Sequence, residues 1–241
     1  MIQISKKELL KFYDEKGVRT KHIGKYDASP GSHVSAITGL IGEDLVLGLF
    51  QHYWEKKCDG NTSEILSYHC REEKPRKHKL DAWLLCTTAK GRRTLYQTEI
   101  KNWSSHSRGM GTYQKPENNA KASERWQRLI ESGKNEALSK VTFTPRISDI
   151  KDKKDTSGKK VNSLKPKPLL CMWSPFATKT ANNECFFKEN DRNRDLCGVD
   201  VFSASLYLRS PNTNDQIHIN APRVTHRLRL LNNIMHQLDQ S

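Results

Sequence analysis

The sequence predicts an α/β fold with a central mixed β-sheet, flanking helices and a basic insertion. Three stretches lead to this expectation. Residues 79–103 have the pattern of two β-strands joined by a short polar turn. Residues 35–54 are apolar nearly all round and predict a buried helix. A continuous apolar run at 168–176 predicts a further buried strand of the same sheet.

The N-terminal part is predicted to contain two helices. Ser5 and Glu8 form a capping-box pattern, so a short helix should begin there and end near Gly17. Residues 18–33 are polar and predict a loop before the long helix. Glu43 falls on an apolar face of that helix, where an acid is either paired internally or directed into a site.

A strand over 64–71 should lead into the central hairpin, whose strands are expected over 80–86 and 94–103. Alternate side chains of a strand share a face, so Glu99 and Lys101 should lie together. Asp81 should fall opposite this segment. A two-residue turn at Lys90–Gly91 would pair Asp81 with Ile100, so a shared site requires a turn of odd length or a bulge.

Asp81, Glu99 and Lys101 together indicate a metal site. Two adjacent carboxylates repel each other unless a cation lies between them. Mg²⁺ prefers such oxygen ligands, and the Ile100 carbonyl could add another. Lys101 would then orient or deprotonate an attacking water. The alternative is an ordinary cross-strand ion pair on a solvated face, which the neighbouring Trp83 makes less suitable.

This D…ExK arrangement, with an acid on a preceding helix, resembles the PD-(D/E)XK nuclease superfamily. Glu43 matches the helix acid, whereas Leu80 stands where the family motif has proline. The resemblance covers about 35–175. It implies a restriction-endonuclease-like core at about 35–176 in a single domain, 1–241, that hydrolyses phosphodiester bonds with Mg²⁺, or alternatively Mn²⁺. It implies Glu43, Asp81, Glu99 and the Ile100 carbonyl as metal ligands, and roles such as restriction, phage defence or DNA repair.

The charge balance favours nucleic acid as the partner, DNA before RNA. Lys and Arg number 41 against 27 acids, for a net charge of +14. Two segments are candidates for phosphate contacts: a Gly- and Ser-rich loop after the hairpin, and a Lys-rich insertion, 149–167, expected to be mobile. A plain solvated loop and a plain tether are the alternatives. The candidate binding residues are His106, Arg108, Tyr113, Lys153, Lys154, Lys159 and Lys160.

The remaining elements are predicted from periodicity. A helix is expected over 119–139, a loop over 182–198, a strand over 199–210 and a final helix over 222–238. The 199–238 segment would form the C-terminal strand and helix of the domain.

Six scattered cysteines suit reduced thiols and a cytoplasmic protein, and no apolar run is long enough to predict a membrane partner. Cys58, His69, Cys70 and His78 could hold zinc, but scattered thiols and surface histidines are the simpler interpretation.

Two rival functions remain: a non-catalytic nucleic-acid-binding protein that retains the nuclease fold, and a basic protein-interaction module. A homodimer or a partner protein in a larger complex is compatible with each.

Overall fold

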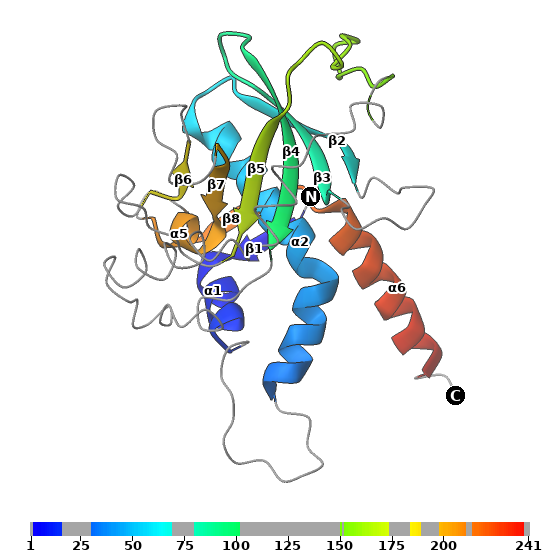
Figure 1. Ribbon diagram of the computed structural model, residues 1–241. Coiled ribbons are helices and arrows are strands. Elements are labelled where there is room, and N and C mark those ends of the chain that lie inside the picture. Colours follow the sequence, from blue (N-terminus) through cyan, green and yellow to red (C-terminus); the bar gives the residue numbers. More distant parts are fainter. Residues whose placement is uncertain are drawn as a thin grey trace.

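The computed structural model describes residues 2–15, 30–68, 80–101, 150, 152–173, 184–188, 198–210 and 214–238. Figure 1 shows the helices and strands of these residues. In chain order they are β1 (Ile2–Ser5), α1 (Lys6–Glu15), α2 (Pro30–Lys57), β2 (Thr62–Tyr68), β3 (Ala82–Thr87), β4 (Arg93–Lys101), β5 (Lys167–Met172), β6 (Phe186–Phe187), β7 (Asp200–Ser203), α5 (Ala204–Arg209), β8 (Gln216–Ile219) and α6 (Pro222–Leu238).

A six-stranded sheet forms the centre of the molecule, with strand order β2-β3-β4-β5-β7-β6. Strands β2, β3 and β4 are antiparallel neighbours. Strand β5 runs parallel to β4, and β7 runs parallel to β5. The sheet is therefore mixed, which confirms the α/β class and the mixed central sheet expected from the sequence. Strands β1 and β8 form a separate antiparallel pair.

Helix α2 covers one face of the sheet (Figure 1). Phe50, which is fully buried, lies at the centre of this layer. Its ring centroid is 6.2 Å from that of Tyr96 and 5.2 Å from that of Phe202. These distances are in the range in which aromatic pairs contribute beyond simple burial. The layer therefore joins α2 to strands β4 and β7.

The opposite face of the sheet carries a second apolar cluster. Trp83, Leu85 and Leu95 are buried there together with Ile150 and Val161. Side chains alternate between the faces of a strand, so the β3 and β4 residues of this cluster point away from α2. Ile150 and Val161 of the Lys-rich insertion thus cover part of the face opposite α2.

The insertion packs on the sheet in its described part, whereas the sequence predicted a mobile segment. An isolated bridge between Lys154 and Lys160 makes it a small hairpin. Arg93 Nη2 lies 2.8 Å from Asp155 Oδ2, so the hairpin is tied to the first residue of β4. The sequence analysis weighed the many lysines and overlooked the few apolar residues, such as Val161, that anchor the segment.

Three predicted helices are present in the structure. Helix α1 follows Ser5, whose Oγ accepts a hydrogen bond from the Glu8 N–H at 3.3 Å. Helix α6 has the predicted bounds. Helix α2 is longer than predicted and begins at Pro30, which the sequence analysis placed in a loop. Proline suits the first turn of a helix because its missing N–H would have no partner there.

The segment 199–210 was predicted as one strand, and this was wrong in its second half. Strand β7 ends at Ser203, and helix α5 follows directly. The Ser203 Oγ accepts a hydrogen bond from the Leu206 N–H at 3.3 Å and so caps the helix. Strand β7 is buried on both faces, which explains why the sequence shows no clear alternation.

Three short strands were not predicted from the sequence. Strand β6 lies within 182–198, which was predicted as a loop, while β1 and β8 were not predicted at all. The predicted helix over 119–139 and the loop before it lie outside the described residues. None of the described helices is long and apolar enough to span a membrane.

Candidate functional site

The register of the central hairpin decides which side chains meet. Thr87 pairs with Arg93, so the turn comprises residues 88–92 and has the odd length that a shared site requires. Ala82 pairs with Thr98 at the other end of the ladder. The same register, continued by one residue, places Asp81 opposite Glu99. The Asp81 N–H donates to the Thr98 carbonyl at 3.1 Å, which keeps the chain in line at this point.

Asp81 is held at the start of β3 by the main chain of β4. Its Oδ2 accepts a hydrogen bond from the Ile100 N–H at 2.7 Å. The pKa of Asp81 is raised from 3.8 to about 7, first by burial and then by the charges of Glu99 and Glu43. The Ile100 hydrogen bond and the charge of Lys101 act in the opposite direction. Asp81 therefore lies among acids in a partly desolvated position.

Glu99 and Lys101 form a close pair on one face of β4. Lys101 Nζ lies 2.6 Å from Glu99 Oε1. The Glu99 side chain is 2% exposed and that of Lys101 is 21% exposed. An ordinary ion pair on a solvated face would leave both groups in water, so that alternative does not fit this pair. The Glu99 carboxylate is therefore buried, whereas the Lys101 side chain is partly exposed.

Glu43 reaches the same end of the sheet from helix α2. Trp54 marks the other end, because its Nε1 donates to the Thr87 carbonyl at 3.4 Å. Glu43 precedes Trp54 by eleven residues, which is about 16 Å of helix at 1.5 Å per residue. Ala82 precedes Thr87 by five residues, about 17 Å of strand. The helix and the strand therefore bring Glu43 and Asp81 to one level, as the effect of Glu43 on the pKa of Asp81 indicates.

The donor set at this end suits a hard cation. Asp81 and Glu99 supply carboxylate oxygens from neighbouring strands, and Mg²⁺ commonly binds through one or two carboxylates together with waters and a substrate phosphate. Within the described ranges, no three His, Cys, Asp or Glu side chains are grouped as a protein-only metal site would require. The contact between Ile100 and Asp81 is made by the amide. The geometry thus provides two carboxylates, with Glu43 nearby.

A second buried acid shows how this fold pairs a structural carboxylate. Asp200 is fully buried on the α2 face of the sheet. Lys167 Nζ lies 2.6 Å from Asp200 Oδ1, and the Tyr96 hydroxyl donates to Oδ2 at 2.9 Å. A cation and a hydroxyl thus satisfy both oxygens, as buried charges require. Asp81 differs because its environment includes two further acids.

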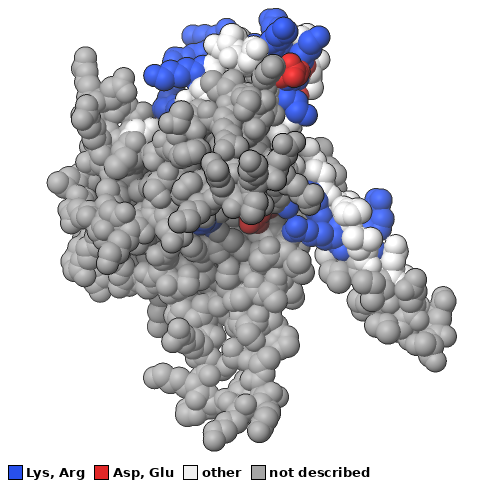
Figure 2. Space-filling model, turned by 45° about the vertical axis from the view of Figure 1, so that its right-hand side comes forward, with Lys and Arg blue, Asp and Glu red and all other residues white. Residues whose placement is uncertain are grey.

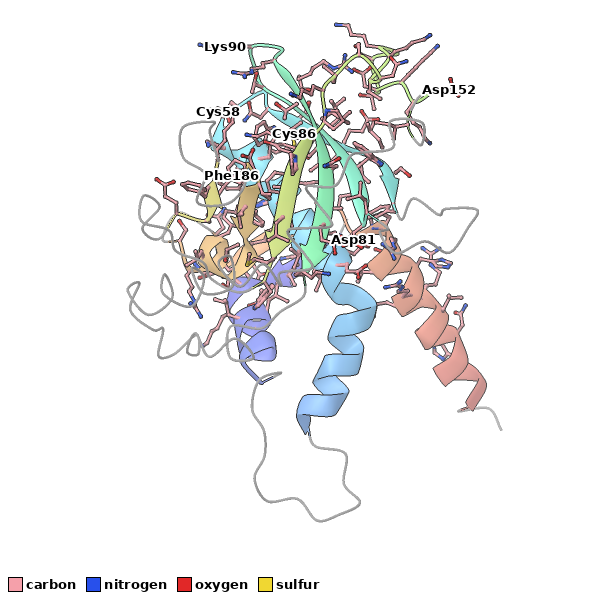
Figure 3. The ribbon with its side chains drawn as sticks, in the orientation of Figure 1. Cys58, Asp81, Cys86, Lys90, Asp152 and Phe186 are labelled. Atoms are coloured by element: carbon pink, nitrogen blue, oxygen red, sulfur yellow. The ribbon has the colours of Figure 1, made fainter. Side chains whose placement is uncertain are left out.

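The four predicted nucleic-acid-binding lysines of the insertion lie away from this end of the sheet. Lys153, Lys154, Lys159 and Lys160 belong to the insertion hairpin, which is tied to Arg93. Arg93 and Glu99 are six residues apart, about 20 Å along an extended strand. Figure 3 shows Asp81 at one end of the hairpin and Lys90 and Asp152 at the other. His106, Arg108 and Tyr113 lie outside the described residues.

The sequence analysis missed two residues beside Asp81. Tyr68 pairs with Ala82, the next residue after Asp81. The Arg223 guanidinium lies 4.9 Å from the centroid of the Tyr68 ring, a cation–π distance. The arginines of the final helix could have pointed to Arg223, but that helix was predicted from the spacing of its apolar residues alone.

The zinc alternative lies mostly beyond the described residues. Cys58 is an exposed free thiol, whereas His69, Cys70 and His78 are outside the described ranges.

Searches of protein-family models, curated proteins and solved structures found no match.

Proposed function

We propose that the protein is a metal-dependent nuclease with a restriction-endonuclease-like core, which hydrolyses phosphodiester bonds, most suitably of DNA. One observation carries the proposal. The turn at 88–92 sets a register in which Asp81 lies opposite Glu99, with Lys101 Nζ 2.6 Å from Glu99. These are the D and ExK positions of the PD-(D/E)XK pattern, and they meet at one end of a mixed sheet that helix α2 covers.

Asp81 and Glu99 would hold the metal, with Glu43 and the Ile100 carbonyl as further ligands. Mg²⁺ is the expected ion and Mn²⁺ the alternative, since both favour carboxylate oxygens. The chemistry that the bound ion supplies is polarisation of the scissile phosphate and a lower pKa for an attacking water.

The side chains of the site have separate tasks. The Ile100 N–H fixes the Asp81 carboxylate, so this ligand is oriented before any ion or substrate binds. Glu99 positions Lys101, whose partly exposed side chain would donate a hydrogen bond to a water beside a bound phosphate. Lys101 thereby orients the water and stabilises negative charge that develops in the transition state.

Incubation of the purified protein with plasmid DNA, linear DNA and RNA tests the proposal. Cleavage of at least one substrate is expected with Mg²⁺ or Mn²⁺, and EDTA should abolish it. An Asp81→Ala variant prepared in the same way should be inactive, which excludes a contaminating nuclease. Binding without cleavage of any substrate under all metal conditions would support the rival, a non-catalytic nucleic-acid-binding protein, and would refute the nuclease.

The adjacent acids of α2 provide a matched pair of variants. Asp44 is 2% exposed, and its Oδ2 accepts a hydrogen bond from the Val224 N–H at 2.9 Å, so it anchors α6. Asp44→Ala should lower the free energy of unfolding by about 1–3 kcal/mol because it leaves a buried N–H without an acceptor. Glu43→Ala should leave stability nearly unchanged and should raise the Mg²⁺ concentration that half-maximal cleavage requires.

Urea unfolding and metal titration of cleavage measure these two effects. If Glu43→Ala matched the wild type in its metal requirement, Glu43 would not belong to the site, and the metal would be held by Asp81 and Glu99.

A further inference from the structure

Helix α6 is anchored beside the candidate site. Val224 is 2% exposed, and its N–H donates to the buried Asp44. Arg223 stacks over the Tyr68 ring, and Tyr68 pairs with Ala82. In Figure 3, Asp81 and the first turn of α6 lie at the same end of the sheet. The position of this turn is therefore set by α2, which carries Glu43, and by β2, which pairs with β3.

Beyond its first turn, α6 projects from the sheet and α2 (Figure 1). Most of its described side chains after Val224 are exposed, including Leu228 and Leu230 at 49% each. The helix contains three arginines and two histidines and no acid. In Figure 2, Lys and Arg side chains gather in two places, along α6 and at the far end of the sheet near the insertion.

The arginines of α6 do not share one face. Arg223 and Arg227 are four residues apart, so they lie on the same side of the helix about 6 Å apart along its axis. Arg229 follows Arg227 by two residues, about 200° round the helix, and lies on the other side. Because Arg223 lies against Tyr68, the Arg223–Arg227 row begins next to the site and continues away from it.

We infer that the Arg223–Arg227 row binds the phosphate groups of the nucleic-acid strand that enters the Asp81–Glu99 site. A guanidinium group binds a phosphate through two parallel hydrogen bonds, and phosphate contacts of this kind set the position of a nucleic acid on a protein. The row is closer to Asp81 than the insertion lysines, which lie beyond the far end of β4. The inference rests on the proposed nuclease function, since the row is expected to bind the strand that the Asp81–Glu99 site would cleave.

A comparison of two single substitutions tests this inference. Arg227→Gln and Arg229→Gln remove the same charge from the same helix, on opposite sides. Binding of a short fluorescein-labelled DNA duplex is measured by anisotropy in EDTA over a range of salt concentrations. Arg227→Gln should weaken binding by nearly tenfold at about 0.1 M salt and should lower the slope of log K against log salt by about 0.9, the value for one phosphate contact. Arg229→Gln should change neither quantity appreciably.

The assay separates this inference from the nuclease proposal, because binding in EDTA requires no cleavage. A selective effect of Arg227→Gln would support the row even if the wild type cleaved no substrate. Equal effects of the two substitutions would indicate net charge alone and would overturn the inference, as would wild-type binding by Arg227→Gln. A dimer in sedimentation that Leu228→Ser dissociates, with duplex binding insensitive to Arg227, would also overturn it and would assign α6 to contact between two copies of the chain.

Discussion

Replacing Lys101 with alanine should lower metal-dependent cleavage by about a thousandfold or more while nucleic-acid binding in EDTA changes only a few-fold. Lys101 Nζ lies 2.6 Å from Glu99 and is the cation of the candidate site. Preorganised groups that stabilise developing charge typically contribute a factor of about 10² to 10³ to the rate, and loss of the oriented water adds to this. Single-turnover cleavage at saturating protein measures the chemical step without a contribution from binding.

Lys90→Ala is the matched control for this experiment. Lys90 is exposed in the 88–92 turn, at the far end of the hairpin from Asp81 (Figure 3). Its removal eliminates the same charge and should leave the single-turnover rate unchanged. If Lys101→Ala cleaved at the wild-type rate at the same concentration of folded protein, Lys101 would have no part in the chemistry, and its pair with Glu99 would be structural.

The hairpin could be predicted from the sequence because its signals are local. Asp81, Glu99 and Lys101 lie within about twenty residues, alternation places the last two on one face, and Gly91 marks the turn. Gly91 has φ +75, a conformation that favours glycine. A shared site requires a turn of odd length, and the Thr87–Arg93 pair shows that the turn has five residues, 88–92. Local pattern thus predicted the end of the sheet where the carboxylates meet.

Features that depend on distant contacts could not be predicted in this way. Strand β1 pairs with β8 from the other end of the chain, and four residues are too few to show a period. The packing of the insertion could not be predicted because Ile150 and Val161 are isolated apolar residues in sequence, although they join one cluster in space. Arg223 lies beside Tyr68 because Asp44 holds the first turn of α6 in place. The contact between Asp44 and Val224 joins residues 180 positions apart, so no local sequence pattern predicts it.

The contrast between Asp81 and Asp200 bears on how the site is maintained. Asp200 is balanced by Lys167 and Tyr96, so its burial supports the sheet. Asp81 accepts the Ile100 hydrogen bond, but it faces the charges of Glu99 and Glu43. Such repulsion is tolerated where function requires it, because proteins accept local destabilisation at sites that bind a ligand. Metal-free protein should therefore be less stable than its sheet and core would otherwise allow.

Asp81→Asn should stabilise the metal-free protein near and above neutral pH. The pKa of Asp81 is about 7 in the folded protein against an ordinary value of 3.8, so the folded state holds this proton more tightly than the unfolded state. Its contribution to stability is fully present below about pH 3.8 and is lost as the pH rises through about 7. The difference corresponds to at most about 4 kcal/mol, at 1.36 kcal/mol per pKa unit. Asparagine carries no charge and its Oδ1 can still accept the Ile100 hydrogen bond.

Urea unfolding in EDTA across this pH range measures the effect, with Asp59→Asn as a control at an exposed acid. The stability of Asp81→Asn should exceed that of the wild type by an amount that grows between about pH 4 and 7 and then levels off. Added Mg²⁺ should reverse the order, because a ligand that binds only the folded state stabilises the wild type and has no site in the variant. Equal stability of the two proteins near pH 8 without metal, or equal stabilisation of both by Mg²⁺, would show that Asp81 is a structural acid outside the metal site.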